Sequence, residues 1–244
     1  MSALPAAVVC GLFLGPIGSL SAIWAVICMV RGDFLSATAA LGFAAFCFGF
    51  IVPFFKVVPG NIRPRAEFDE NGTTFRPDRG IDVPIAVSLL GLAIGGGMLA
   101  VFKPIGQLDI PVPEQMRLSI PFTGGVAAVA IVPILVRTLR RGGSKYLRLT
   151  PEGFEIAQGW AVKRGRWADV KDVTDDQPGQ SKPTPAAIAI GLADGSWLAV
   201  AGASFVPNGD ALRKLVRFYW QNPKQRNELT DDRAINRLRR APAR

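Results

Sequence analysis

Four long stretches of the chain contain no charged residue, and charged residues border each of them. The stretches cover residues 1–30, 34–55, 83–102 and 118–136. An α-helix needs about 20 predominantly apolar residues to cross the hydrocarbon core of a membrane. Backbone polar groups cannot be left unpaired in lipid, so each stretch is predicted to be helical despite its many Gly and Phe residues. The predicted spans are about 4–30, 34–55, 83–102 and 120–139.

Two of these stretches have an alternative interpretation. The first could be a cleaved signal peptide, but no Lys or Arg precedes it, and its apolar run far exceeds the roughly 7–15 residues of a signal h-region. The fourth could be a buried helix of a soluble domain, because Pro133 lies within it. The basic cluster Arg137, Arg140 and Arg141 at its end favours a span anchored at the cytoplasmic face.

Short stretches of the C-terminal third alternate polar and apolar side chains, as half-buried β-strands do. Tyr146–Thr150 and Phe154–Ile156 flank a Pro-Glu-Gly turn, which predicts a hairpin. Asp194-Gly195 joins a second pair of strands in the same way. These strands are Ala187–Leu192 and Trp197–Ala201.

An amphipathic helix is predicted after the strands. Its apolar stripe, at i, i+3, i+4 and i+7, consists of Leu212, Leu215, Val216 and Tyr219. Thr230 is expected to cap a last short helix that buries Ile235 and Leu238. The arginines of that helix, expected in solvent, are Arg237, Arg239 and Arg240.

The loop between the second and third spans, residues 56–82, also has a hairpin pattern. Ala66–Phe75 can be aligned with Leu147–Ile156, which places Gly72 on Gly153. Either the plan of two helices and a hairpin occurs twice, or the two hairpins are unrelated, and both interpretations stay open. In either case we expect the loop to pack on the C-terminal domain.

Several short strands closed by one C-terminal amphipathic helix resemble a pleckstrin-homology-type barrel. Tyr146–Ile156 (YLRLTPEGFEI), followed by Arg166–Val170 (RWADV), resembles the bacterial membrane proteins with pleckstrin-homology-like domains. In that family a strand with a Thr-x-x-Gly turn precedes a short Pro/Arg-Trp-x-x-Ile/Val element. The resemblance covers about 145–222. It implies a membrane-tethered small barrel that binds lipid or protein, although a fold alone does not fix function.

The predicted architecture is an α+β membrane protein with four transmembrane helices and a small pleckstrin-homology-like β-barrel or sheet domain, capped by a C-terminal amphipathic helix. Residues 1–141 form the transmembrane region, which includes a cytoplasmic hairpin loop at 56–82. Residues 142–222 form the pleckstrin-homology-like cytoplasmic domain. Residues 223–244 form a basic tail with a short helix.

The distribution of charge predicts the orientation. The net charge of +9 lies in residues 137–244, with 20 Lys/Arg and 11 Asp/Glu, whereas residues 1–136 carry eight of each. With four spans, the N-terminus, loop 56–82 and the C-terminus share one side. Loop 56–82 and the flank 137–148 carry five Lys/Arg each, against three in the loops opposite. Because Lys and Arg accumulate on the cytoplasmic side, both termini of this inner-membrane protein are predicted to be cytoplasmic.

Residue types exclude several chemistries. The chain has no His, and Cys10, Cys28 and Cys47 all lie in apolar stretches, so no catalytic triad and no His- or Cys-based zinc site is expected. Neither a P-loop nor a clean dinucleotide-binding motif occurs. We therefore expect no enzyme activity, catalytic residue, metal or cofactor. Nucleic acid is not an expected partner either, because aromatic and basic residues are not interleaved.

The basic segment Lys163-Arg164-Gly165-Arg166 is the best candidate site, interpreted as a loop between strands. Such a loop could contact phosphate head groups, each nearby cation contributing ~1 kcal/mol. Flanking tryptophans could lie at the membrane interface. The alternative, a solvated loop beside two core tryptophans, stays open. The candidate lipid or partner contacts are Lys163, Arg164, Arg166, Trp160, Trp167, Arg140 and Arg141.

Two functions are compatible with these features. The first is a non-enzymatic, multi-pass inner-membrane protein, in contact with the lipid bilayer, whose cytoplasmic domain binds a protein partner or anionic lipid head groups. The alternative is a subunit of a membrane transporter or channel, which four compact Gly-rich spans would suit. The absence of Asp, Glu, Lys, Arg and His from the four uncharged stretches argues against the alternative, because such residues commonly mark ion and proton pathways.

The predicted orientation can be tested with an epitope tag. In spheroplasts treated with protease, a tag at the C-terminus should survive, because the inner membrane shields it. A tag inserted into loop 103–117 should be digested, and this serves as the control. Immunoblotting before and after membrane permeabilisation checks both results. Digestion of the C-terminal tag in intact spheroplasts would contradict the orientation.

Overall fold

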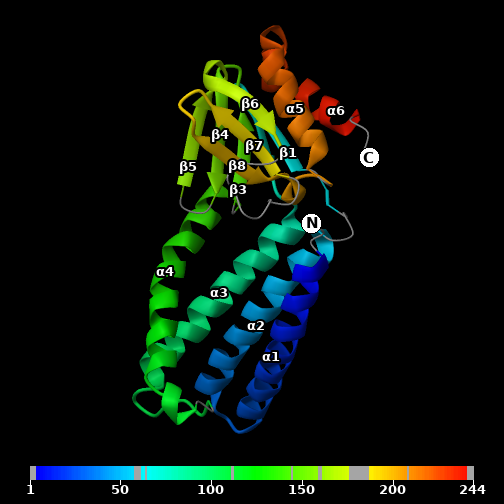
Figure 1. The fold of residues 1–244 in the computed structure, drawn as a ribbon. Coiled ribbons are helices and arrows are strands. Elements are labelled where there is room, and N and C mark those ends of the chain that lie inside the picture. The colour runs from blue at the N-terminus through cyan, green and yellow to red at the C-terminus, as the bar shows by residue number, and fades with distance from the viewer. Residues whose placement is uncertain are drawn as a thin grey trace. The chain divides into compact units, whose positions relative to one another are not determined.

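Four helices of the described chain are long and apolar enough to cross a membrane, in agreement with the predicted spans. They are α1 (Leu4–Val30), α2 (Phe34–Val57), α3 (Arg79–Phe102) and α4 (Ser119–Arg141). The computed structural model (Figure 1) describes residues 4–57, 62–63, 65–110, 113–143, 145–158, 161–175, 187–207 and 209–240. α4 ends where Gly142 adopts a left-handed conformation and its N–H binds the carbonyls of Leu139 and Thr138.

The chain divides into two compact units. Leu4–Phe55 and Asp82–Gly142 form the first, here called the helical unit. Lys56–Ile81 and Gly143–Arg244 form the second, called the sheet unit. The second unit therefore draws its residues from two separate parts of the sequence.

Small residues bring α2 and α3 together. A Cβ atom on Gly91 would lie 2.4 Å from the carbonyl oxygen of Gly42, and one on Gly95 would lie 3.0 Å from that of Ala39. The Ser88 hydroxyl donates a hydrogen bond of 2.8 Å to the Phe46 carbonyl. Such close backbone approach strengthens helix packing in lipid. Gly91 and Gly95, which are four residues apart in α3, thus serve packing within the chain. Two glycines of α1, by contrast, face open space: Gly11 and Gly15.

The sheet unit contains a five-stranded antiparallel sheet in the order β1-β2-β3-β4-β5. The strands are β1 (Arg65–Asp69), β2 (Gly72–Arg76), β3 (Lys145–Leu149), β4 (Gly153–Gln158) and β5 (Ala161–Arg166). β2 pairs with β3, with Phe75 opposite Leu147 and Thr73 opposite Leu149. The hairpin of loop 56–82 therefore packs on the C-terminal strands, as expected, and it does so as part of their sheet.

A second antiparallel sheet, in the order β6-β7-β8, follows in the chain. Its strands are β6 (Val170–Thr174), β7 (Ala187–Leu192) and β8 (Trp197–Ala201). Gly195 has φ +82 in the β7–β8 turn, the conformation that its Asp-Gly sequence predicts. α5 (Asp210–Gln221) then buries its predicted stripe in the core of the unit. The largest fully buried side chains include Trp167, Tyr219, Phe75, Phe205, Leu147 and Leu149.

The core also includes the residues after α5. They form a 3-10 helix, η4 (Pro223–Thr230), and the helix α6 (Arg233–Arg240). Leu229, Ala234 and Leu238 are buried in the same cluster as the strands. The Thr73 hydroxyl, itself buried, donates a 2.6 Å hydrogen bond to the Leu229 carbonyl. As far as residue 240, the segment that the sequence suggested as a basic tail is therefore part of the folded unit.

The contribution of the hairpin can be measured with two Phe substitutions. Phe75 is 2% exposed and Phe68, in the partner strand, is 49% exposed. Phe75→Ala should lower the free energy of unfolding by about 3–5 kcal/mol, because it leaves a cavity in the core. Phe68→Ala should change it by less than about 1 kcal/mol.

Urea unfolding of the full chain in detergent micelles, followed by tryptophan fluorescence, checks both values. Four of the five tryptophans belong to the sheet unit, so the signal reports mainly on that unit. Equal destabilisation by the two substitutions would contradict the role assigned to the β2–β3 pairing.

Candidate functional site

The basic segment Lys163-Arg164-Gly165-Arg166 lies within β5, not in a loop between strands as the sequence suggested. β5 pairs with β4 on one side and is an edge of the five-stranded sheet. Lys163, Arg164 and Arg166 are all exposed. Charged side chains on an edge strand discourage pairing with other chains, which is a structural role that needs no ligand.

Each of the arginines on this face of the sheet forms an ion pair with a nearby carboxylate. Arg164 Nε lies 2.7 Å from Glu155, and Arg166 Nε lies 3.0 Å from Asp169. In β3, on the other side of β4, Arg148 Nη2 lies 2.6 Å from an oxygen of Asp69. A hollow of about 400 Å³ over these strands is lined by Arg148, Arg164 and Arg166 among others. Its three arginines have three carboxylate partners, so little positive charge is left for an anionic ligand.

Glu155 is the centre of this network. Its carboxylate accepts hydrogen bonds from the Tyr146 hydroxyl and from Arg164. Burial by itself would raise the pKa of Glu155, but these two hydrogen bonds and the charges of Arg164 and Arg148 outweigh it and hold the pKa below its ordinary value. The ionised form of Glu155 therefore stabilises the fold.

Of the two tryptophans proposed as interface residues, the structure describes Trp167. Trp167 is 2% exposed, and its indole N–H donates a 2.8 Å hydrogen bond to the Thr150 carbonyl. The Arg226 guanidinium lies 5.3 Å from the centroid of its ring. Trp167 is thus a core residue, unable to contact a membrane surface. Trp160 lies outside the described residues.

The remaining candidates belong to the helical unit. Arg140 is exposed in the last turn of α4. Arg141 ends that helix, and its side chain lies outside the description. The structure therefore brings Lys163, Arg164 and Arg166 together on one strand, while the two α4 arginines belong to another unit.

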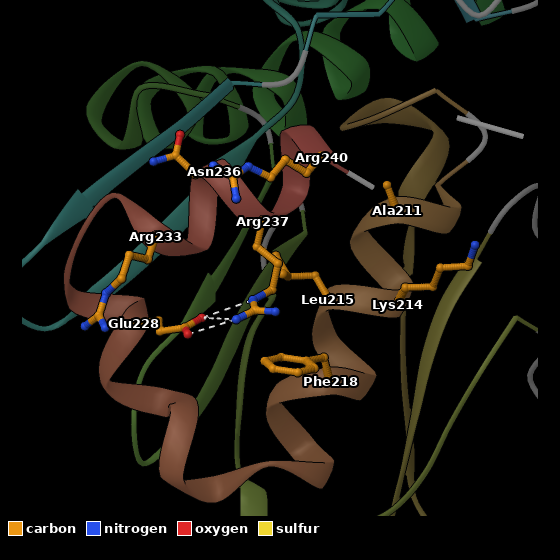
Figure 2. A pocket seen from close by; sticks show the side chains of 9 residues that line it. All are labelled: Ala211, Lys214, Leu215, Phe218, Glu228, Arg233, Asn236, Arg237 and Arg240. Carbon is orange, nitrogen blue, oxygen red and sulfur yellow. Dashed lines mark hydrogen bonds and ion pairs between the residues drawn. The ribbon is translucent and has the colours of Figure 1, made fainter. Parts of the chain in front are cut away.

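A second concave site lies between α5 and α6 (Figure 2). The pocket has a volume of about 590 Å³. Four cations and one carboxylate line it, together with Asn236 and an apolar floor. The charged residues are Lys214, Glu228, Arg233, Arg237 and Arg240, and the floor consists of Ala211, Leu215 and Phe218. We call this site the α5–α6 groove.

Arg237 holds the groove in shape. Its guanidinium makes hydrogen bonds of 2.8, 2.9 and 3.0 Å to the two carboxylate oxygens of Glu228. It also lies 4.1 Å from the centroid of the Phe218 ring, as a cation–π contact. Figure 2 shows the guanidinium between Glu228 and Phe218. Arg237 was expected in solvent, but it links α6 to η4 and α5.

Glu228 is buried and has a second partner in α5. The Tyr219 hydroxyl donates a 3.2 Å hydrogen bond to Glu228 Oε2. Burial and the adjacent negative charge of Glu228 both raise the pKa of Tyr219, so the phenol stays protonated and remains a donor. The carboxylate is therefore held from both sides and is not available to a ligand.

The other cations of the groove are differently placed. Arg233 pairs with Asp231, at 2.6 Å. Lys214 and Arg240 are exposed, and neither forms an ion pair with another described residue. After Glu228 and Asp231 have been matched, Lys214 and Arg240 remain as uncompensated positive charges beside an apolar floor.

A sequence signal for the groove lies in the spacing of the α6 side chains that line it. Arg233, Asn236, Arg237 and Arg240 are spaced three or four residues apart, and residues at this spacing share one face of a helix. No group of three His, Cys, Asp or Glu side chains that could hold a metal occurs in the described part of the chain.

Comparison with known proteins gives no relative for this chain. No protein-family model matches it, and no curated protein or solved structure is significantly similar to it.

Glu155 gives a prediction for the dependence of stability on pH. Glu155→Gln should lower the free energy of unfolding at pH 7 by about 1 kcal/mol, because a charge-assisted hydrogen-bond network loses its acceptor charge. A carboxyl group whose pKa is lowered by folding stabilises the fold above its unfolded pKa, near 4.5 for Glu. The difference between wild type and variant should therefore shrink as the pH falls below that value.

Urea unfolding between pH 7 and pH 3 measures this difference. Glu152→Gln is the matched control, because Glu152 is exposed in the adjoining turn. It should behave like wild type at each pH. A difference for Glu155→Gln that stays constant as the pH falls would be inconsistent with the proposed linkage.

Proposed function

We propose that this chain is a non-enzymatic, multi-pass inner-membrane protein whose cytoplasmic sheet unit is a pleckstrin-homology-like binding module. The observation that carries the proposal is the α5–α6 groove, a concave site with an apolar floor and unmatched positive charge. Two antiparallel sheets of five and three strands followed by an amphipathic helix support the pleckstrin-homology-like assignment. The abundance of Lys and Arg around the sheet unit supports the cytoplasmic side.

The partner that best fits the groove is an acidic segment of a protein that also carries apolar side chains. Leu215 and Phe218 offer a floor for an apolar side chain, and burial of apolar surface is the main source of affinity at such sites. Lys214 and Arg240 offer partners for carboxylates. A flat membrane surface would contact protruding residues in preference to this recessed floor, so a peptide segment is favoured over lipid head groups.

Charge reversal in the groove tests the proposal. The probe is a fluorescent peptide of Glu, Leu and Phe, compared with a peptide in which Gln replaces every Glu. Fluorescence anisotropy with the full chain in detergent micelles should show preference for the acidic peptide. The double substitution Lys214→Glu with Arg240→Glu should weaken that binding about tenfold or more, equivalent to about 1.4 kcal/mol.

Arg239→Glu is the matched control, because Arg239 is exposed on α6 but does not line the groove. It should leave binding unchanged. Equal affinity for the two peptides, or equal weakening by Arg239→Glu, would refute the assignment of the groove. Displacement of the peptide by a soluble inositol phosphate at comparable concentration would assign the groove to head groups instead of a protein partner.

A further inference from the structure

The helical unit contains a further concave site, and the role proposed for it does not depend on the function proposed above. α3 and α4 are in backbone contact where two glycines meet. A Cβ atom on Gly96 would lie 2.7 Å from the Gly124 carbonyl oxygen, and one on Gly124 would lie 2.9 Å from that of Gly96. One turn further along α3, the Ala100 Cβ would lie 2.9 Å from a Cβ atom built on Gly125. The helices are therefore held together over a seam that their side chains do not fill.

An apolar trough of about 1290 Å³ lies along this seam. α3 contributes Ala100 and the residues just after α3 contribute Lys103 and Pro104, while most of the wall comes from the first half of α4. The apolar lining residues of α4 and the residue before it are Leu118, Pro121, Phe122, Gly125, Val126, Val129 and Ala130. Phe122 and Val129 are 73% and 76% exposed. Because these residues belong to a candidate membrane span, the open side of the trough faces the apolar phase in a bilayer.

The length of the trough matches one leaflet of a bilayer. From Leu118 to Ala130 the α4 helix rises about 18 Å at 1.5 Å per residue. The hydrocarbon core is about 30 Å thick, so one leaflet contributes about half of that. An extended acyl chain lying against α4 would thus fill the trough from its mouth to the middle of the membrane.

Positive charge gathers at one end of the trough only. Lys103 and Arg117 line that end, with Ser119 between them and the apolar wall, and none of the described lining residues carries a carboxylate. Lys103 Nζ donates to the carbonyls of Leu108 and Ile110, at 3.3 and 2.6 Å. An ammonium group has three N–H donors, so one remains for a ligand. Arg117 is exposed, and its guanidinium has no hydrogen-bond or ion-pair partner among the described residues.

We propose that this trough binds an anionic glycerophospholipid, with one acyl chain along α4 and its phosphate between Lys103 and Arg117. Charge-assisted hydrogen bonds from Lys and Arg to phosphate are stronger than neutral ones. Lys103 is fixed by two backbone carbonyls, so it is oriented before the lipid arrives. A second copy of the chain is a poorer occupant, because it would bury two unmatched cations in an apolar interface.

Native mass spectrometry of the full chain in detergent micelles tests the proposal, with phosphatidylglycerol and phosphatidylcholine as probes. Wild type should retain phosphatidylglycerol at least tenfold better than phosphatidylcholine. The double substitution Lys103→Gln with Arg117→Gln should abolish this preference. Lys171→Gln removes an exposed cation of the sheet unit and should leave the preference intact.

Filling the trough gives a second, independent readout. Val126→Trp places a large side chain in it and should reduce binding of both lipids. Val132→Trp is the control, because Val132 is exposed on α4 outside the trough. Equal retention of the two phospholipids by wild type, or a preference that survives loss of both cations, overturns the proposal. Binding of glycerol 3-phosphate as tight as that of phosphatidylglycerol also overturns it, because the site would then recognise a soluble phosphate.

Discussion

The pairing of β2 with β3 is the constraint on which the rest of the structure depends. β2 comes before α3 and β3 comes after α4, yet Phe75 lies opposite Leu147 in one sheet. Strands of one sheet cannot lie on opposite sides of a bilayer, since every backbone group in lipid must be paired within the segment that spans it. If α3 and α4 cross a membrane, they must therefore leave and return on the side of the sheet unit. Loop 56–82 and the C-terminal third then share a side whichever side that is.

The same pairing explains why the segment after α5 is ordered. Thr73 of β2 donates its buried hydrogen bond to the carbonyl of Leu229, so the inserted hairpin holds η4 in place. η4 in turn positions Glu228, and Glu228 fixes Arg237 of α6. A buried donor or acceptor left without its partner costs about 1–3 kcal/mol. Each contact in this series therefore depends on the one before it. The inserted hairpin therefore helps to hold the elements that form the α5–α6 groove.

Whether a feature can be predicted from the sequence depends on how far apart the interacting residues are along the chain. The four spans were recognised because lipid requires an uninterrupted apolar stretch, and the β7–β8 hairpin because Asp194-Gly195 is a local turn signal. The β2–β3 pairing joins residues more than 70 positions apart, and no local pattern encodes such a partner. The basic residues 163–166 of β5 have the sequence pattern of a loop because they lie at a sheet edge, largely exposed on both faces, and lack the alternation that marks a half-buried strand. The groove was missed because the pairing of Arg237 with buried Glu228 depends on how η4 turns.

Excess positive charge indicates a binding site only where the basic side chains do not already pair with nearby carboxylates. On the sheet, three arginines around β5 face three carboxylates, and this balance removes most of the attraction that the basic segment suggested. Residues 210–240, by contrast, carry nine Lys/Arg and four Asp/Glu, so more than half of the net charge of +9 lies in the two C-terminal helices and the turn between them. In both concave sites, the free cations lie where an apolar wall lowers the local dielectric constant and strengthens their attraction for an anion. Unmatched cations beside apolar surface, more than the total number of basic residues, therefore distinguish a binding site from a solvated face in this protein.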